Sequence, residues 1–155
     1  GQSVVYGRRG LGFGIYETRI DGVGEDREIA SGYEPAMGPD GRLLAYRKDR
    51  PGEPHVRILD VETGQGRRVP MDLPGGTTPI VARWTGDGER LLVAGQHPID
   101  PIQQYLVGID GGQVERLPVQ GYWARWFDPA HPWDVSARGK RPFTWGWLKS
   151  LSKRP

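Results

Sequence analysis

Residues 33–70 contain four short strand candidates separated by three turn signals, and this unit constrains the fold more than any other feature of the sequence. Its first turn is Pro39-Asp40-Gly41, in which proline presets φ, aspartate caps the turn and glycine takes the left-handed position. The apolar runs on either side of this turn are expected to pair as an antiparallel hairpin. Residues 43–46 and 56–61 are the predicted second and third strands, and residues 67–70 form a short charged edge strand.

The same unit recurs 47 to 50 residues downstream. The repeated pieces are the turn Gly86-Asp87-Gly88, the strand 91–94 (which repeats 43–46), the strand and turn 105–111, and the edge 115–118. Between the second and third strands, residues 48–54 are charged and contain two prolines. We therefore predict that residues 48–54 are not part of a central strand.

Partial copies of the unit flank both repeats. Residues 4–6, 15–22 and 27–29 match a second, third and fourth strand. At the other end, Ala124-Arg125-Trp126 copies Ala82-Arg83-Trp84, which predicts a first strand at 122–128. Periods of roughly 40–50 residues with four strands each are typical of β-propeller blades. The predicted fold class is all-β, with about three blades of four antiparallel strands, and a generic antiparallel sandwich is the alternative.

The repeats predict two domains, a partial β-propeller at residues 1–128 and a C-terminal Trp-rich basic tail at 129–155. The propeller is divided into a blade remnant 1–31, a blade 32–71, a blade 78–119 and a closing strand 121–128. Propellers have at least about four blades. We therefore expect either that upstream blades are missing, which is the favoured interpretation, or that two chains combine as a homodimer in one six-bladed ring.

Composition sets further limits. The chain has 24 glycines and 14 prolines without low complexity, as expected for a turn-rich all-β fold. A formal net charge of +2 gives no reason to predict nucleic-acid binding. The sequence lacks an apolar run of about 18 residues, so stable membrane insertion is not predicted. It has no cysteine, which leaves both oxidising and reducing compartments open.

Residues 39–46, followed by 58–64, resemble the WD-repeat-like blades of TolB-type propellers, and the resemblance covers roughly residues 4–128. Departures are Gly38 for the usual serine, Gly86 for the usual proline, and Asp128-Pro129-Ala130 in place of the last turn. The tail resembles the closing segment of some bacterial secreted or periplasmic propeller proteins. The resemblance implies a bacterial periplasmic or secreted propeller that binds a protein or peptide partner, and it implies no catalytic residues.

No catalytic, metal or cofactor site is predicted. The histidines lack the spacing of metal ligands; they are His55, His97 and His131. The recurring aspartates are explained by turn capping; they are Asp40, Asp60, Asp87 and Asp110. No Gly-x-Ser-x-Gly elbow occurs, although prolyl-oligopeptidase-type enzymes carry a propeller beside a hydrolase domain. The glycine run 7–14 lacks dinucleotide-binding spacing and is predicted to be a hairpin.

Arginine and tryptophan supply the candidate binding residues, which are Arg83, Trp84, Arg125, Trp126, Trp145 and Trp147. The first two pairs lie on predicted first strands, which line a propeller's channel. Alternation places Trp between blades and Arg toward the neighbouring blade's rim or the channel, and pure packing is the alternative. The two tail tryptophans are expected to fold back onto the propeller, to anchor a partner, or to lie at a membrane interface.

The predicted function is that of a non-enzymatic binding scaffold for protein or peptide recognition in the bacterial envelope. A rigid frame with variable loops suits recognition. The alternatives are the substrate-gating propeller of a hydrolase, and a propeller that binds a glycan or small ligand.

Overall fold

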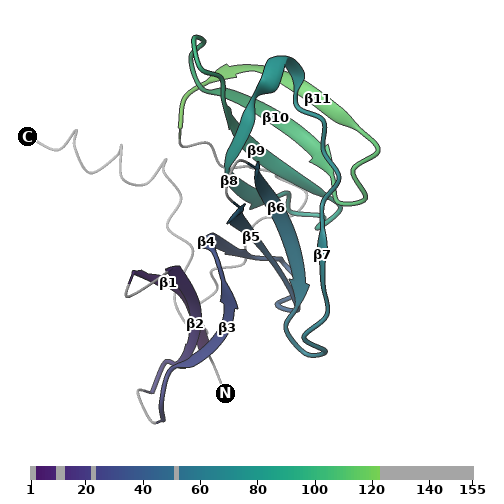
Figure 1. Cartoon of the computed structure of the whole chain (residues 1–155). Coiled ribbons are helices and arrows are strands. Elements are labelled where there is room, and N and C mark those ends of the chain that lie inside the picture. Colours follow the sequence, from purple (N-terminus) through teal and green to yellow (C-terminus); the bar gives the residue numbers. More distant parts are fainter. Residues whose placement is uncertain (1–2, 10–12, 22–23, 51–52, 123–155) are drawn as a thin grey trace, which may run out of the picture.

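A computed structural model of the chain describes residues 3–9, 13–21, 24–50 and 53–122. These residues form three antiparallel sheets that follow one another along the chain, from purple through blue to green (Figure 1). Blade A contains β1 (Ser3–Arg9), β2 (Phe13–Arg19) and β3 (Arg27–Ser31). Blade B contains β4 (Tyr33–Met37), β5 (Leu43–Arg50), β6 (Glu53–Asp60) and β7 (Gly66–Arg68). After a short 3-10 turn η1 (Pro74–Gly76), blade C contains β8 (Thr78–Trp84), β9 (Arg90–Gln96), β10 (Gln103–Gly108) and β11 (Val114–Gln120).

Each sheet has its strands in chain order, so every blade is a simple up-and-down meander. The first strands of blades B and C, β4 and β8, contact each other. This arrangement confirms the predicted all-β class with antiparallel propeller blades. Within the described part of the chain, no helix is long and apolar enough to cross a membrane. The predicted closing strand at 122–128 and the tail at 129–155 lie outside the described residues, apart from Tyr122.

The turn chemistry expected from the sequence is confirmed. Gly41 has φ 70°, and Asp40 Oδ1 accepts backbone hydrogen bonds from Arg42 N at 3.0 Å and Leu43 N at 3.2 Å. The second copy of the turn has Gly88 at φ 73°. There Asp87 Oδ1 accepts from Glu89 N at 2.9 Å. Because the aspartates satisfy their own backbones, their recurrence has a local structural cause.

Two sequence-based expectations are wrong. Residues 48–54 were expected to interrupt the strands, but β5 and β6 pair without a break, with Lys48 opposite His55 and Asp49 opposite Pro54. The charged side chains are tolerated because Lys48 is half-buried and Asp49 is exposed rather than in the core. An extended hairpin therefore replaces the predicted loop.

The second error is a one-residue slip in the repeat. Gly38 N donates to Leu43 O at 2.6 Å, and the equivalent bond joins Thr85 N to Arg90 O at 3.0 Å. The strands of blades B and C are therefore offset by the same number of residues as their turns. With this offset Leu91 is the counterpart of Leu44, whereas the repeat as aligned from the sequence pairs Leu92 with Leu44. A slip of one residue exchanges the two faces of a strand. With the correct offset, Leu44 and Leu91 both face the preceding blade.

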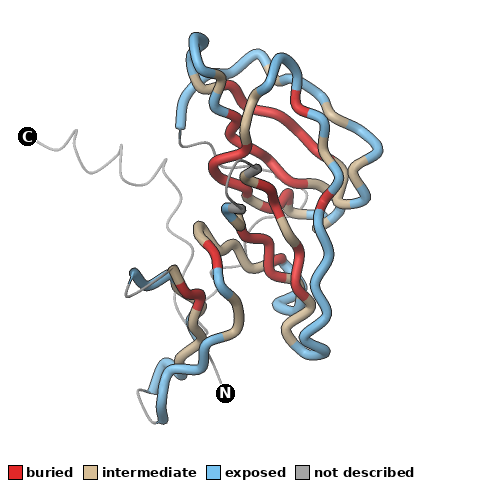
Figure 2. The backbone as a smooth tube through the Cα atoms, in the orientation of Figure 1, coloured by how far each residue is buried: buried red, intermediate tan, exposed pale blue. Residues whose placement is uncertain are grey.

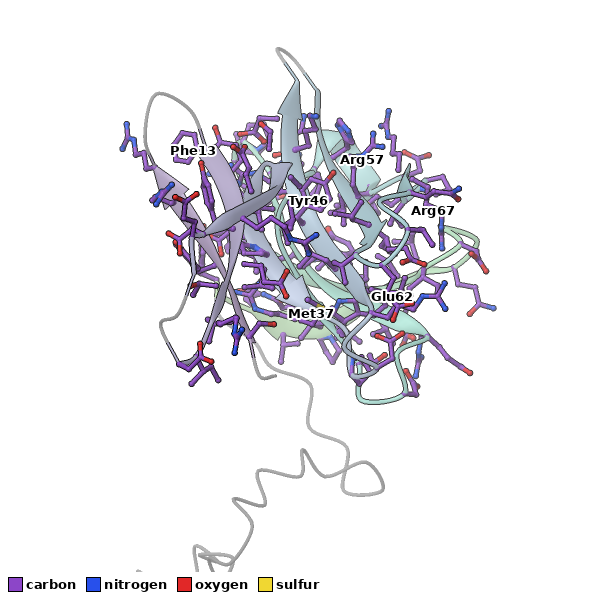
Figure 3. All side chains as sticks on the ribbon, turned by 90° about the horizontal axis from the view of Figure 1, so that it is seen from below. Phe13, Met37, Tyr46, Arg57, Glu62 and Arg67 are labelled. Atoms are coloured by element: carbon purple, nitrogen blue, oxygen red, sulfur yellow. The ribbon has the colours of Figure 1, made fainter. Side chains whose placement is uncertain are left out.

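The core lies between the blades. In Figure 2 most of the buried backbone follows the strands of blades B and C, and blade A has only a short buried stretch. Between blades B and C the buried residues are Ala45, Val56, Ile58, Val69, Leu73, Ala82, Trp84, Leu91, Val93, Tyr105 and Val107. Between blades A and B they are Ile15, Leu44, Tyr46 and Leu59. Met37, labelled with Tyr46 in Figure 3, packs against this second cluster. Each blade therefore depends on its neighbour for its core.

Candidate functional site

The side chains of Arg83 and Trp84 lie on opposite faces of β8, as strand alternation requires. Trp84 is only 3% exposed, and its indole N–H donates to the backbone oxygen of Ala36 on β4 at 2.8 Å. The predicted wedge between blades is thereby confirmed. On the other face of β8, Arg83 Nη2 lies 3.6 Å from Glu34 Oε2. Arg83 therefore meets the rim of the neighbouring blade, as the alternation predicts.

Glu34 is positioned by a distortion of β4. It is the one described non-glycine residue with positive φ, at 51°. The register of β4 against β5 shifts between Tyr33 and Ala36, which marks a bulge at this residue. Bulges re-aim side chains at functional edges, and a positive φ on a residue with a Cβ costs free energy. The bulge presents Glu34 to the innermost strand of blade C.

Arg47 completes this cluster from the second strand of blade B. Its Nη1 donates to Ile80 O on β8 at 3.2 Å, and its Nη2 donates to Asp49 Oδ2 at 3.0 Å. Its guanidinium also lies 4.8 Å from the centre of the Tyr33 ring. We call Glu34, Arg47, Asp49 and Arg83 the inner rim. The inner rim thus carries two cations and two carboxylates on the first two strands of blade B and the first strand of blade C.

The inner rim is suited to recognition. Its side chains are partly exposed, with 29% of Arg83 and 34% of Glu34 open to solvent. A partly exposed ion pair contributes little to stability, so its charges can be re-paired with a ligand at small cost. Arginine offers a planar fork of donors that matches carboxylates and backbone carbonyls. The remaining predicted site residues Arg125, Trp126, Trp145 and Trp147 lie outside the described residues.

A second feature lies at the end of the blades where Pro54 and His55 of β6, the β9–β10 connection and the segment 69–77 gather, which we call the loop face. Two cavities flank the turn η1 there. One, of about 240 Å³, lies against blade B and is lined by His55 and Asp72 among others. The other, of about 380 Å³, lies against blade C and is lined by His97, Asp100 and Arg116 among others. Cavities of this size accept a side chain or a chain terminus rather than a folded partner.

Sequence reasoning missed the loop face. His55 and His97 were considered separately, in a strand and in a loop, and Arg116 was assigned only to an edge strand. The residues that meet around η1 come from the strands β6, β10 and β11, the β9–β10 connection and the segment 69–77. The repeat itself was the available signal, because equivalent connections of neighbouring blades meet at the same end.

The sequence has peptidase-associated relatives. No protein-family model matches it. It is 36% identical over 85 residues to the uncharacterized peptidase YuxL of Bacillus subtilis, a match that covers 51% of this chain and 12% of that protein. It is 31% identical over 86 residues to Tricorn protease homolog 1 of Streptomyces coelicolor, covering 54% of this chain and 8% of that protein. The chain thus spans a small part of the length of these curated relatives.

Solved structures confirm the fold. TolB from Acinetobacter baumannii has a TM-score of 0.62 and 25% identity, covering 77% of this chain and 30% of that one. The β-propeller domain of the Trilobed protease from Pyrococcus furiosus has a TM-score of 0.52 and 16% identity, covering 78% and 42%. Pyrococcus horikoshii acylaminoacyl peptidase has a TM-score of 0.52 and 17% identity, covering 74% and 22%. The predicted TolB-like propeller is thereby confirmed over the generic sandwich.

The expectation of a non-enzymatic protein is wrong. Both sequence relatives are named as peptidases or protease homologs, and propellers of peptidases are among the similar structures. A repeat-based prediction could not find this association, because the motifs it used build the blade and are shared by propellers of many functions. The comparisons point to a peptidase-related protein.

Proposed function

Because the chain carries TolB-like β-propeller blades, we propose that these blades select the peptide substrates of a peptidase-related protein. The observation that carries the proposal is the charged contact between innermost strands, where Glu34 on β4 meets Arg83 on β8. The two peptidase-named relatives support the peptide chemistry. This function corresponds to the substrate-gating alternative rather than to the scaffold favoured by the repeat pattern.

The inner rim provides a physical basis for selection. A peptide that passes along innermost strands presents backbone carbonyls, amides and charged side chains, all of which lose water on contact and need partners. Arg47 and Arg83 can donate to peptide carbonyls or carboxylates, and Glu34 can accept from a basic side chain. The rim would therefore favour peptides by their charge.

Three finer statements belong to the same proposal. The first is recognition of a protein or peptide partner at the loop face, and the second is a periplasmic or secreted location. The likeness to TolB supports both. The third, which applies if the chain is complete, is the pairing of two chains in one ring, because the three described sheets are too few to close a ring alone.

The test measures kcat/KM of the whole protein for two peptides of equal length, one with an acidic and one with a basic central residue. Arg83→Gln removes one cation from the inner rim without adding an opposite charge. We expect the preference for the acidic peptide to fall about fivefold, which corresponds to roughly 1 kcal/mol for a partly exposed charge contact.

The matched control is Arg19→Gln, because Arg19 is an exposed arginine on blade A that pairs with Asp21. This variant should leave the ratio of the two kcat/KM values unchanged. A folded whole protein that cleaves no peptide would overturn the proposal. An equal change of the ratio in both variants would also overturn it, since the effect would then reflect net charge rather than the inner rim.

A further inference from the structure

We propose that the loop-face cavity of blade C binds the C-terminal carboxylate of a peptide, with Arg116 as the anion-binding residue. The peptide nature of the ligand rests on the proposed function, whereas the anion site rests on the geometry of blade C alone. The site is assembled from the edge strand β11, the β9–β10 connection and the turn η1. None of these contributes to the inner rim.

A bulge in β11 lies beside the site, between its lining residues Arg116 and Gln120. Gln103 on β10 pairs with Gln120, but Tyr105, only two residues later, pairs with Arg116. Residues 117–119 are therefore looped out opposite a single residue of β10. The middle residue of this bulge, Pro118, has no N–H to lose from the ladder. Bulges of this kind change the direction of neighbouring side chains.

Gln103 fixes the bulge and the arginine together. Its side chain is buried, at 6% exposure, and its Nε2 donates to Leu117 O at 2.5 Å and Val119 O at 2.8 Å. Both carbonyls belong to the bulge. With both amide hydrogens used, the remaining Oε1 accepts from Arg116 Nη2 at 3.0 Å. A buried and fully bonded amide therefore holds Arg116 in place.

Arg116 has donors to spare. A guanidinium has five N–H groups, and Gln103 Oε1 takes one of them. Among the described residues no carboxylate pairs with Arg116, and the nearby Asp100 carboxylate instead lies 3.1 Å from His97 Nδ1. The cation is thus oriented by a neutral group and keeps its charge for a ligand. A carboxylate can accept two parallel hydrogen bonds from such a fork.

The cavity suits the last residue of a peptide. Its volume is about 380 Å³, and Pro74, Pro101 and Tyr105 supply apolar walls. On the wall formed by η1, Gly75 has φ 67°, and a Cβ built there would lie 3.5 Å from His97 Nε2. The backbone of η1 therefore approaches the cavity closely without a side chain. The Asp100 carboxylate of the lining pairs with His97, which leaves Arg116 beside the apolar walls. A single arginine matches a carboxylate with an attached side chain better than it matches a phosphate dianion, which needs more donors.

The test measures binding of penta-alanine to the whole protein by isothermal titration calorimetry. Penta-alanine amide, which lacks the terminal carboxylate, is the matched ligand. We expect the free acid to bind about tenfold more tightly than the amide, a difference typical of one charge-assisted contact. Arg116→Gln should abolish this difference, and Arg116→Lys should restore part of it, since lysine keeps the charge but not the fork.

The exposed Arg116 is not part of the core, so the variants are expected to fold, and a thermal melt checks this. Arg19→Gln is the control for net charge. Equal binding of acid and amide, or a preference that survives in Arg116→Gln, overturns the site. If inorganic phosphate, at the same concentration as penta-alanine, displaces penta-alanine from the protein, the site binds anions in general and its assignment to a peptide carboxylate is wrong. If the protein binds the free acid selectively but cleaves no peptide, this inference stands and the proposed function fails.

Discussion

The two blade interfaces are built differently. Among the residues that the structure describes, eleven buried hydrophobic residues form the cluster between blades B and C, whereas four form the cluster between blades A and B. The smaller interface adds a contact between two rings. Phe13 and Tyr33 have ring centroids 4.0 Å apart, and the Arg47 guanidinium lies over the Tyr33 ring, 4.8 Å from its centre. The comparison teaches that the B–C interface combines the larger buried core with polar contacts from Trp84, Arg83 and Arg47, whereas the A–B interface has a smaller core and an aromatic contact.

Trp84→Ala tests the larger interface and should have the largest effect. The indole is buried between the blades and its N–H bonds to Ala36 O. We expect the free energy of unfolding to fall by about 3–5 kcal/mol, through the cavity and the lost donor together. Urea unfolding followed by far-ultraviolet circular dichroism measures this without relying on tryptophan fluorescence.

Trp84→Phe separates the two contributions. It keeps most of the ring volume but removes the donor, so a loss of about 1–2 kcal/mol is expected. If Trp84→Ala lowers the free energy of unfolding by less than the roughly 1–2 kcal/mol expected for Trp84→Phe, the indole does not hold blades B and C together.

Gly111→Ala tests a backbone contact across the same interface. Gly111 has φ 80°, and a Cβ there would lie 1.8 Å from Pro70 O, at the end of blade B. We expect a loss of roughly 3 kcal/mol, because backbone strain and a clash act together. Gly41→Ala is the control, since Gly41 has φ 70° but nothing within 4 Å of its Cβ. The free energy of unfolding of the control should fall by about 1 kcal/mol, the cost of a Cβ at positive φ. Equal losses in the two variants would show that the backbone at Pro70 moves aside at little cost.

Ile15→Ala tests the smaller interface. Ile15 is fully buried among Leu44, Tyr46 and Leu59. We expect a loss of about 2 kcal/mol, at the low end for such substitutions because the surrounding cluster is small and can relax. Val4→Ala on the neighbouring strand is the control, with a loss within about 0.5 kcal/mol, because Val4 is 45% exposed. A loss from Ile15→Ala as large as that from Trp84→Ala would remove the contrast between the interfaces.

Local chemistry explains what the sequence predicted well. Turn aspartates and glycines act within three or four residues, so Pro39-Asp40-Gly41 and its repeat were identifiable without tertiary information. The pair Arg83 and Trp84 was also divided correctly between two faces, because strand alternation has a period of two. The repeat was aligned wrongly by one residue at Leu91 and Leu92, because two adjacent leucines do not indicate which of them faces the preceding blade.

The loop face depended on contacts that no local rule provides. Arg116 and Gln103 are thirteen residues apart and meet only because three residues of β11 are looped out. Glu34 meets Arg83 across two blades, after a bulge that places a glutamate at positive φ. The sequence pattern gave Glu34 and Gln103 no role and placed Arg116 only on an edge strand, since bulges carry no clear sequence signal.

The smallest expected effect concerns a single turn of blade B, at the end of β6. Arg42 Nη2 donates to Asp60 Oδ2 at 2.6 Å, and the backbone N–H groups of Thr63 and Glu62 donate to Asp60 Oδ1 at 3.0 Å. The Arg42 hydrogen bond, with help from these backbone donors, lowers the pKa of Asp60 to about 2. An aspartate in the unfolded chain has a pKa near 3.9.

The sign of the pH effect follows. Because the folded pKa is the lower one, the contribution of Asp60 to stability is fully present above about pH 4 and is lost as the pH falls toward 2. Asp60→Asn cannot ionise, so its melting temperature should lie below that of the wild type near neutral pH. The gap should close between about pH 4 and pH 2. It should also shrink in high salt, because Arg42 is half exposed. A gap that stays constant down to pH 2 would mean that the turn is stabilised by the shape of Asp60 rather than by its charge.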